Sequence, residues 1–183
     1  MSRRRVRLVL LCEDSQHEAF LRRFFQRAGW NRRAIRVEKS PQGRGAGEQW
    51  VRERFPDELQ SIRKGHVAAM LAVMVDADRS TVKDRLVALD AACNRAGKTP
   101  RRAAEPVAVF VPRRNIETWI AYLSGRDVDE TEAYPKLARE RDCAEPVRIL
   151  KAMCDAGELR LPGPPSLEAA CTEYQTRVGT LDT

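Results

Sequence analysis

The sequence predicts an α/β fold, a compact parallel sheet flanked by helices, with a small helical extension at the C-terminus. Short apolar runs of strand length alternate with longer stretches in which apolar residues recur at helical spacing. The runs are apolar almost throughout, as expected for strands buried on both faces. With 183 residues, 43% of them hydrophobic, the chain is long enough for one core. We expect that core over residues 1–126 and a helical, acidic extension packed on it over 127–183.

The first two strand-length runs flank a stretch of helical periodicity. Val6–Cys12 is nearly continuous in its apolar character and predicts a buried strand. Ser15 and Glu18 match the capping-box spacing and predict a helix start, and Gly29 marks the helix end. Ile35–Val37 then predicts a short second strand.

A glycine-rich loop over residues 40–47 precedes the second predicted helix. That helix is expected from about Glu48 to Arg63, with a kink or a break at Pro56. Val67–Val75 is the second long apolar run and predicts a strand. Residues 80–81, a serine and a threonine, are expected to open the helix that follows.

The last predicted strand lies near the middle of the chain. Gly97 ends the preceding helix, and Val107–Val111 predicts the strand. A helix is expected to begin near Asn115. The acidic segment Asp127–Gly157 is expected to be helical, and one short helix is expected within residues 166–183, after a proline-rich break.

The cysteines and the apolar runs bear on the cellular compartment. The chain has five cysteines, an odd number, and no Cys-x-x-Cys pair, which predicts buried reduced thiols rather than a zinc site or a disulfide framework. Reduced thiols are typical of the cytoplasm. No run approaches the 18 apolar residues of a transmembrane helix, and the first apolar run is too short for a signal peptide. We therefore expect a cytoplasmic protein without a membrane partner.

The positive charge is concentrated in the first part of the chain. The formal net charge is +7, and residues 1–64 hold 16 Lys and Arg against 8 Asp and Glu. Residues 127–183 hold 7 against 12. Because the arginine fork matches phosphate oxygens, such a basic region favours nucleic acid as the partner. The alternative is that an arginine-rich composition is a habit of the whole genome.

Three carboxylates are predicted at one edge of the sheet. Glu13 directly follows the first strand, and Asp76 and Asp78 follow the third. In parallel sheets, sites form beyond the carboxyl ends of the strands, so these side chains should meet there. In extended backbone, residues two apart point the same way, so both aspartates can face one Mg²⁺ or Mn²⁺ ion. The alternative is that acids after a strand cap the next helix.

This pattern resembles the TOPRIM family, which includes topoisomerases, bacterial primases, ribosomal-RNA maturases and OLD-like nucleases. The resembling segments are Leu8–Glu13 and Leu71–Asp78. The resemblance implies a compact TOPRIM-like parallel α/β sheet, Mg²⁺ bound by the matched Glu13, Asp76 and Asp78, and cleavage or joining of phosphodiesters. The sequence departs from the family at Asp14, where glycine is usual, and at His17, where an acid is common. The first departure puts the approach of a phosphate in doubt, and the second puts a second metal in doubt.

A second segment, Val111–Trp119, is similar to a Glu-x-Trp segment of small TOPRIM-like proteins from bacterial defence and mobile-element neighbourhoods. This similarity adds Glu117 to the expected catalytic residues. The alternative for Glu117 is an acid in the first turn of a helix, favoured by the helix dipole. Trp119 is expected in the core.

Together these features predict a divalent-metal-dependent nuclease acting on DNA or RNA. Glu13 and Asp76 are expected as direct metal ligands, and Asp78 as a direct or water-mediated one. Glu117 or His17 is expected to assist with a second ion or with proton transfer. The arginines expected to contact nucleic-acid phosphates are Arg44, Arg101, Arg102, Arg113 and Arg114.

Two further function classes remain open. The chain fits a non-catalytic or latent TOPRIM-like subunit that docks on a larger ATPase partner, because it is short and its last third is acidic. It also fits a nucleotide-binding α/β regulator. A P-loop is excluded, because no Lys-Ser or Lys-Thr follows the glycine-rich loop. The three tyrosines lack a context for topoisomerase chemistry.

Overall fold

The computed structural model describes residues 7–41, 46–65 and 69–178. Its centre is a four-stranded sheet in the order β2-β1-β3-β4, in which every neighbouring pair is parallel. The strands are β1 (Arg7–Cys12), β2 (Ile35–Lys39), β3 (Ala69–Met74) and β4 (Val107–Phe110). The predicted parallel α/β fold is confirmed.

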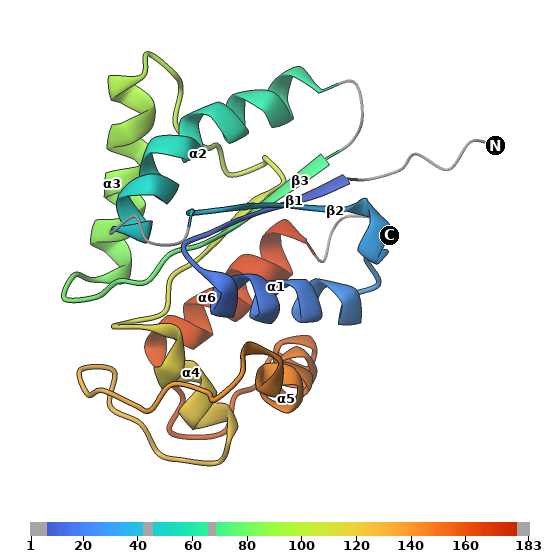
Figure 1. The fold of residues 1–183 in the computed structure, drawn as a ribbon, viewed down its shortest axis with the longest axis vertical. Coiled ribbons are helices and arrows are strands. Elements are labelled where there is room, and N and C mark those ends of the chain that lie inside the picture. Colours follow the sequence, from blue (N-terminus) through green and yellow to red (C-terminus); the bar gives the residue numbers. More distant parts are fainter. Residues whose placement is uncertain (1–6, 42–45, 66–68, 179–183) are drawn as a thin grey trace.

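Helices cover both faces of the sheet, which is seen nearly edge-on in Figure 1. The helices are α1 (Ser15–Arg27), α2 (Gly47–Lys64), α3 (Val82–Arg95), α4 (Ile116–Leu123), α5 (Ala144–Ala156) and α6 (Pro165–Arg177). Two short 3-10 turns, Arg32–Ala34 and Glu140–Cys143, precede β2 and α5. The helices α2 and α3 lie on one face, and α1 and α6 lie on the other, with α4 and α5 farther out.

The alternation of side chains along β1 explains the two layers. Leu8 and Leu10 are fully buried in the cluster formed with α1, α4, α5 and α6. Val9 and Leu11 are buried in the opposite cluster with α2 and α3. A central strand with both faces covered must be apolar at every position, and that is why the first run in the sequence reads as continuous.

The starts of α2, α3, α4 and α6 agree closely with the sequence, whereas α1 has a different cap residue. Asp14 caps α1, because its carboxylate accepts a hydrogen bond from the backbone nitrogen of His17 at 2.9 Å. The expected cap, Ser15, is instead the first helical residue. Thr81 and Asp84 form a reciprocal capping box at α3, where the sequence predicted only that residue 80 or 81 opens the helix. Pro56 is accommodated within α2, which stays a single helix.

The segment before α5 corrects the sequence reading. Residues 127–139 contain no helix, and the regular α-helix begins only at Ala144. Pro135 restricts the residue before it to extended backbone. Asp129 turns the chain by accepting hydrogen bonds from the backbone nitrogen and the hydroxyl of Thr131. The acidic composition of this segment therefore reflects turns and not a helix surface.

The cysteine prediction is partly wrong. Cys154 on α5 and Cys171 on α6 form a disulfide, although Cys12, Cys93 and Cys143 are free and buried as expected. The two helices pack side by side and bring the Cα atoms within 5.0 Å, which is in the range a disulfide needs. Spacing of 17 residues in the sequence carries no signal of this contact.

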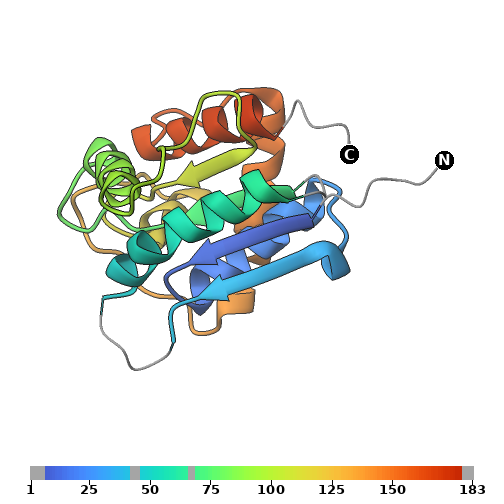
Figure 2. The ribbon, with the colours of Figure 1, turned by 90° about the horizontal axis from the view of Figure 1, so that it is seen from above.

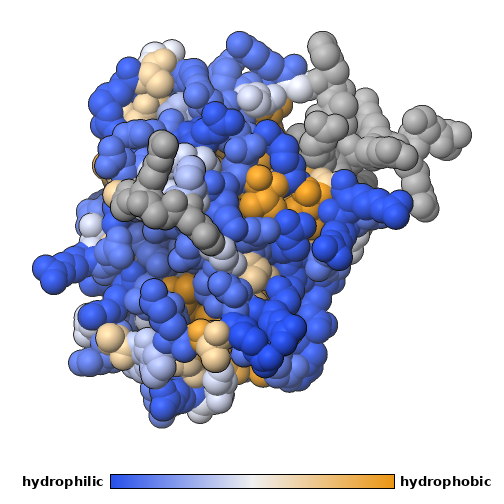
Figure 3. All heavy atoms as spheres, in the orientation of Figure 1, coloured by the Kyte–Doolittle hydropathy of each residue, from blue (hydrophilic) through white to orange (hydrophobic). Residues whose placement is uncertain are grey.

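The strands run in one direction, so their carboxyl ends share one edge of the molecule, as Figure 2 shows for β1 and β2. The face in Figure 3 is largely hydrophilic, with apolar atoms confined to small areas. Among the described residues, no helix is both long and apolar enough to cross a bilayer.

Candidate functional site

The carboxyl ends of β1 and β3 are joined by a candidate ligand. Glu13 directly follows β1, and Asp76 lies two residues beyond the end of β3, its neighbour in the sheet. A carboxylate oxygen of Glu13 accepts a hydrogen bond from the backbone nitrogen of Asp76 at 2.6 Å. Two residues that are 63 positions apart in the sequence therefore meet at the expected edge.

His17 completes this group from the first turn of α1. Its side chain is fully buried, and Nε2 lies 3.1 Å from a carboxylate oxygen of Asp76, whose side chain is 13% exposed. The cap made by Asp14 fixes the turn that carries His17. The other ring nitrogen, Nδ1, is buried and has no hydrogen-bond partner among the described residues. Such orphaned polar atoms in proteins are usually satisfied by water or by an ion.

Asp78 has a different environment from Asp76. Its backbone is left-handed, with φ of 52°, and its side chain is 61% exposed. One carboxylate oxygen pairs with the guanidinium of Arg85 at 3.0 Å. The expectation that both aspartates face the same way in extended backbone is therefore wrong, because the chain turns at Asp78.

Glu117 enters the same region from α4. It lies in the first turn of that helix and is only 7% exposed. Burial raises the pKa of its carboxyl, and the Asp76 carboxylate adds to the rise. Trp119, two residues later on the same helix, is in the core as predicted. Glu117 is thus both a first-turn acid and an acid electrostatically coupled to Asp76.

The pKa values of the two buried carboxyl groups, Glu13 and Asp76, are raised. The pKa of Glu13 is raised to about 7, chiefly by burial; His17 lowers it, and the Asp76 carboxylate raises it. Burial also raises the pKa of Asp76, against the influence of His17. Burial lowers the pKa of His17, but the surrounding carboxylates, Asp76 first, outweigh it and raise that pKa to about 10. The imidazolium therefore acts as the internal counter-charge of Asp76.

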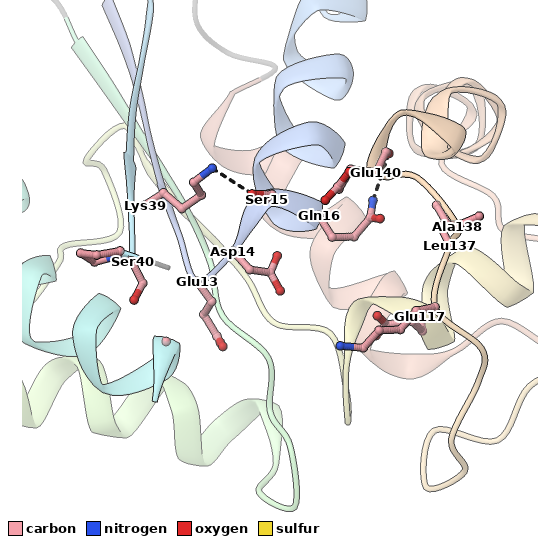
Figure 4. Close-up of a pocket in the computed structure, with 13 residues that line it drawn as sticks. Glu13, Asp14, Ser15, Gln16, Lys39, Ser40, Glu117, Leu137, Ala138 and Glu140 are labelled. Atoms are coloured by element: carbon pink, nitrogen blue, oxygen red, sulfur yellow. Dashed lines mark hydrogen bonds between the residues drawn. The ribbon is translucent and has the colours of Figure 1, made fainter. Parts of the chain in front are cut away.

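A pocket of about 380 Å³ opens beside Glu13 and Glu117. Figure 4 shows these residues on its two sides, with Asp14 and Gln16 between them. Lys39 donates hydrogen bonds to Ser15 and Glu18, and the positive charge of Lys136 acts against the raised pKa of Glu117. The remaining lining residues are Ser40, Pro41, Gly47, Leu137, Ala138 and Glu140.

The predicted arginines are divided between two edges. Arg113 and Arg114 follow β4 at the carboxyl edge, where the backbone oxygen of Arg114 accepts from the nitrogen of Asp78 at 2.8 Å. Arg101 and Arg102 precede β4 and lie at the opposite edge. Arg101 is paired with Glu173 on α6 at 2.7 Å, a contact that fastens this helix to the sheet. Arg44 lies outside the described residues.

Two residues of the site had no signal in the sequence. Gly47 begins α2, and a Cβ atom there would lie 2.9 Å from the Cβ of Glu13. Arg85 contacts the turn that holds Asp78 and also Glu48 of α2. A glycine in a glycine-rich loop and an arginine on an amphipathic helix are both ordinary in sequence. Only the packing of α2 and α3 on the strand ends makes them informative.

The donors fit a hard divalent cation in chemistry, and less completely in geometry. Glu13 and Asp76 offer oxygen donors of the kind that Mg²⁺ and Mn²⁺ prefer, and burial raises the pKa of both carboxyl groups although His17 lowers it. Among the described residues, however, no three His, Cys, Asp or Glu side chains are arranged to hold one ion. The pairs His17–Asp76 and Arg85–Asp78 occupy two of the three expected ligands.

No protein-family model matches the chain, and no curated protein or solved structure shows significant similarity to it. The parallel α/β fold is therefore established by the structure alone.

Proposed function

We propose that the protein is a divalent-metal-dependent nuclease that hydrolyses phosphodiester bonds in DNA or RNA. The observation that carries this proposal is the hydrogen bond from the backbone nitrogen of Asp76 to the carboxylate of Glu13. It brings two partly buried carboxyl groups together at the ends of adjacent central strands. The imidazolium of His17 balances only one of these two carboxyl groups, and a divalent ion next to the pocket would supply the further positive charge.

Glu13 and Asp76 would hold the metal directly, and Asp78, which stays paired with Arg85, would contribute through a water. A bound Mg²⁺ or Mn²⁺ supplies an activated water and charge neutralisation. Glu117, with its raised pKa, would hold a proton near the reacting group. Arg113, at the same edge, would neutralise a phosphate of the substrate.

A membership in the TOPRIM family is part of this proposal. The order of a strand-end glutamate, a helix and a later strand-end Asp-x-Asp supports it, as does Glu117 on the next strand–helix unit. A place in a bacterial defence or mobile-element system rests on the same resemblance. A cytoplasmic location is also proposed, and the disulfide between Cys154 and Cys171 weighs against it.

A second candidate function is a latent subunit that becomes active, or only binds, on a larger ATPase partner. The observation that favours it is the neutralisation of Asp76 by His17 and of Asp78 by Arg85. A partner that moved α1 or α3 would release these carboxylates. The isolated chain would then be inactive although its ligands are present.

The test is cleavage of plasmid DNA and structured RNA by the purified chain with Mg²⁺ or Mn²⁺. We expect cleavage that is abolished by EDTA and lost in Asp76→Asn, which keeps a hydrogen-bonding group opposite His17 but removes the charge. Asp90→Asn on α3 is the matched control and should retain activity. Cleavage that survives Asp76→Asn would refute this site, and inactivity of the wild-type chain alone would favour the latent subunit.

A further inference from the structure

The guanidinium of Arg85 lies at the junction of three segments of the candidate site. Its Nε donates to the backbone oxygen of Asp76 at 2.9 Å, and Nη2 contacts the backbone oxygen of Ala77 and the carboxylate of Asp78. Its Nη1 lies 3.1 Å from a carboxylate oxygen of Glu48 in the first turn of α2. A single side chain on α3 thus contacts the whole Asp76–Asp78 turn and the start of α2.

These contacts differ from those of an ordinary surface ion pair. The side chain of Arg85 is only 15% exposed, and two of its acceptors are backbone carbonyls beyond the end of β3. Exposed ion pairs contribute little, but charge-assisted hydrogen bonds to backbone oxygens fix the course of the chain. The turn needs such fixing, because Asp78 has a left-handed backbone that residues with a Cβ rarely adopt.

The contact with Glu48 extends this restraint to the other carboxylate of the site. Gly47, the residue before Glu48, packs so closely on Glu13 that a Cβ would not fit. The position of α2 and the position of Glu13 are therefore linked. Through Glu48 on one side and Asp76–Asp78 on the other, Arg85 spans both carboxylate-bearing strand ends.

We propose that Arg85 is a positioning residue, which holds the Asp76–Asp78 turn and the start of α2 in the arrangement that binds the metal. The claim about metal affinity rests on the proposed function, whereas the claim that Arg85 holds the turn does not. It makes two separate predictions. Without Arg85, the turn loosens in the metal-free protein, and the affinity of the site for Mn²⁺ falls.

The experiment compares Arg85→Gln and Arg85→Lys with wild type and with Arg95→Gln, an exposed arginine on the same helix. Amide hydrogen exchange without metal reports on the turn, because the nitrogens of Ala77 and Asp78 donate to Pro112 and Arg114. Direct binding of Mn²⁺, followed by its electron paramagnetic resonance signal, reports on the site. Neither readout requires cleavage.

We expect Arg85→Gln to speed exchange at Ala77 and Asp78 and to weaken Mn²⁺ binding by about tenfold, as losses of supporting contacts at metal sites do. Arg85→Lys should be intermediate, since an ammonium cannot reach all four acceptors. Arg95→Gln should match wild type. Cleavage at saturating Mn²⁺ should fall less than the affinity does.

Wild-type exchange and wild-type Mn²⁺ binding in Arg85→Gln would overturn the proposal. If Arg85→Gln does not fold, the same comparison is made with Arg85→Lys, and unchanged exchange and binding there would equally overturn it. Wild-type protein that binds no Mn²⁺ would instead refute the proposed function. In that case, exchange at the turn still decides whether Arg85 holds it.

Discussion

The carboxylate of Glu13 and the backbone nitrogen of Asp76 are joined by a hydrogen bond of 2.6 Å, which ties the ends of the two central strands together. The contact uses only the oxygen and not the negative charge of Glu13. Glu13→Gln should therefore keep this hydrogen bond and remove the charge. We expect a folded protein in which Mn²⁺ no longer raises the melting temperature, because one of two ligand charges is gone.

Glu13→Ala is the informative comparison, since it removes both the charge and the acceptor. The amide of Asp76 is then left without its partner, and the stability should fall by about 1–3 kcal/mol relative to Glu13→Gln. Chemical denaturation without metal measures the difference. Equal stability of the two variants would mean that the hydrogen bond between Glu13 and Asp76 does not stabilise the strand ends.

Stability of the metal-free protein should decrease as pH rises from 4.5 to about 7. In that interval the folded state holds a proton on Glu13, whose pKa is raised to about 7, while the unfolded chain has lost it. Fewer protons bound in the unfolded state give a negative slope of stability with pH. The shift from 4.5 to about 7 corresponds to roughly 3 kcal/mol for this one group.

Melting curves in EDTA across this range measure the effect, with Glu13→Gln as the control that should lack it. His17 contributes in the same direction at higher pH, because its pKa is also raised, from 6.5 to about 10. A slope that persists above pH 7 in Glu13→Gln therefore belongs to the His17–Asp76 pair, because the pKa of Asp76 is raised as well. Stability that rises between pH 5 and 7 in both proteins would contradict a protonated Glu13.

The fold could be predicted because its strongest signals are local. The apolar runs of β1 and β3 have to be continuous, since helices bury both of their faces. Thr81 caps α3 through the residue three positions later, a pattern visible in a few letters of sequence. The prediction of a helix over residues 127–139 was wrong, because an acidic composition suits both turns and exposed helix faces. Composition alone does not separate them.

The site was predictable only in part. The rule that parallel strands end at one edge was enough to bring Glu13 and Asp76 together. It was not enough for Asp78, because a left-handed residue ends the extended backbone there and its carboxylate pairs with Arg85. The roles of Gly47 and Arg85 depend on how α2 and α3 pack on the strand ends, and that packing is a long-range property.

Gly47→Ala should perturb the site from outside the carboxylate set. The added methyl would lie 2.9 Å from the Cβ of Glu13 and 3.2 Å from its backbone oxygen, so Glu13 or α2 must shift. Overpacking of this kind costs about 1–3 kcal/mol. We expect a lower stability and weaker Mn²⁺ binding, measured by melting and by direct titration.

Glu53→Ala, an exposed position on the same helix, controls for helix propensity and should leave Mn²⁺ binding unchanged. A Gly47→Ala protein that is more stable than wild type, with the same Mn²⁺ affinity, would show that the close approach to Glu13 is not required.

The disulfide should stabilise the C-terminal helices against unfolding. It closes a loop with a sequence separation of 17, for which chain entropy alone predicts about 3 kcal/mol. Reductant should therefore lower the melting temperature of wild type. A Cys154→Ser, Cys171→Ser double variant should melt at the reduced wild-type temperature and be insensitive to reductant. Equal melting of oxidised and reduced wild type would show that the bond is not formed or carries no stability.

Ser166 on α6 contacts the loop that follows β4, at the carboxyl edge of the sheet. Its hydroxyl oxygen accepts from the indole nitrogen of Trp119 at 2.8 Å and from the backbone nitrogen of Arg113 at 3.1 Å, and its hydroxyl donates to Glu130. Ser166→Ala leaves buried donors without a partner, so stability should fall by about 1–3 kcal/mol. The position of Arg113 would also be less defined, and binding of nucleic acid should weaken with a smaller dependence on salt.

Ser124→Ala, which removes a hydroxyl bonded only within its own helix end, is the control. Unchanged stability and unchanged salt dependence in Ser166→Ala would separate the C-terminal helices from the function of the edge.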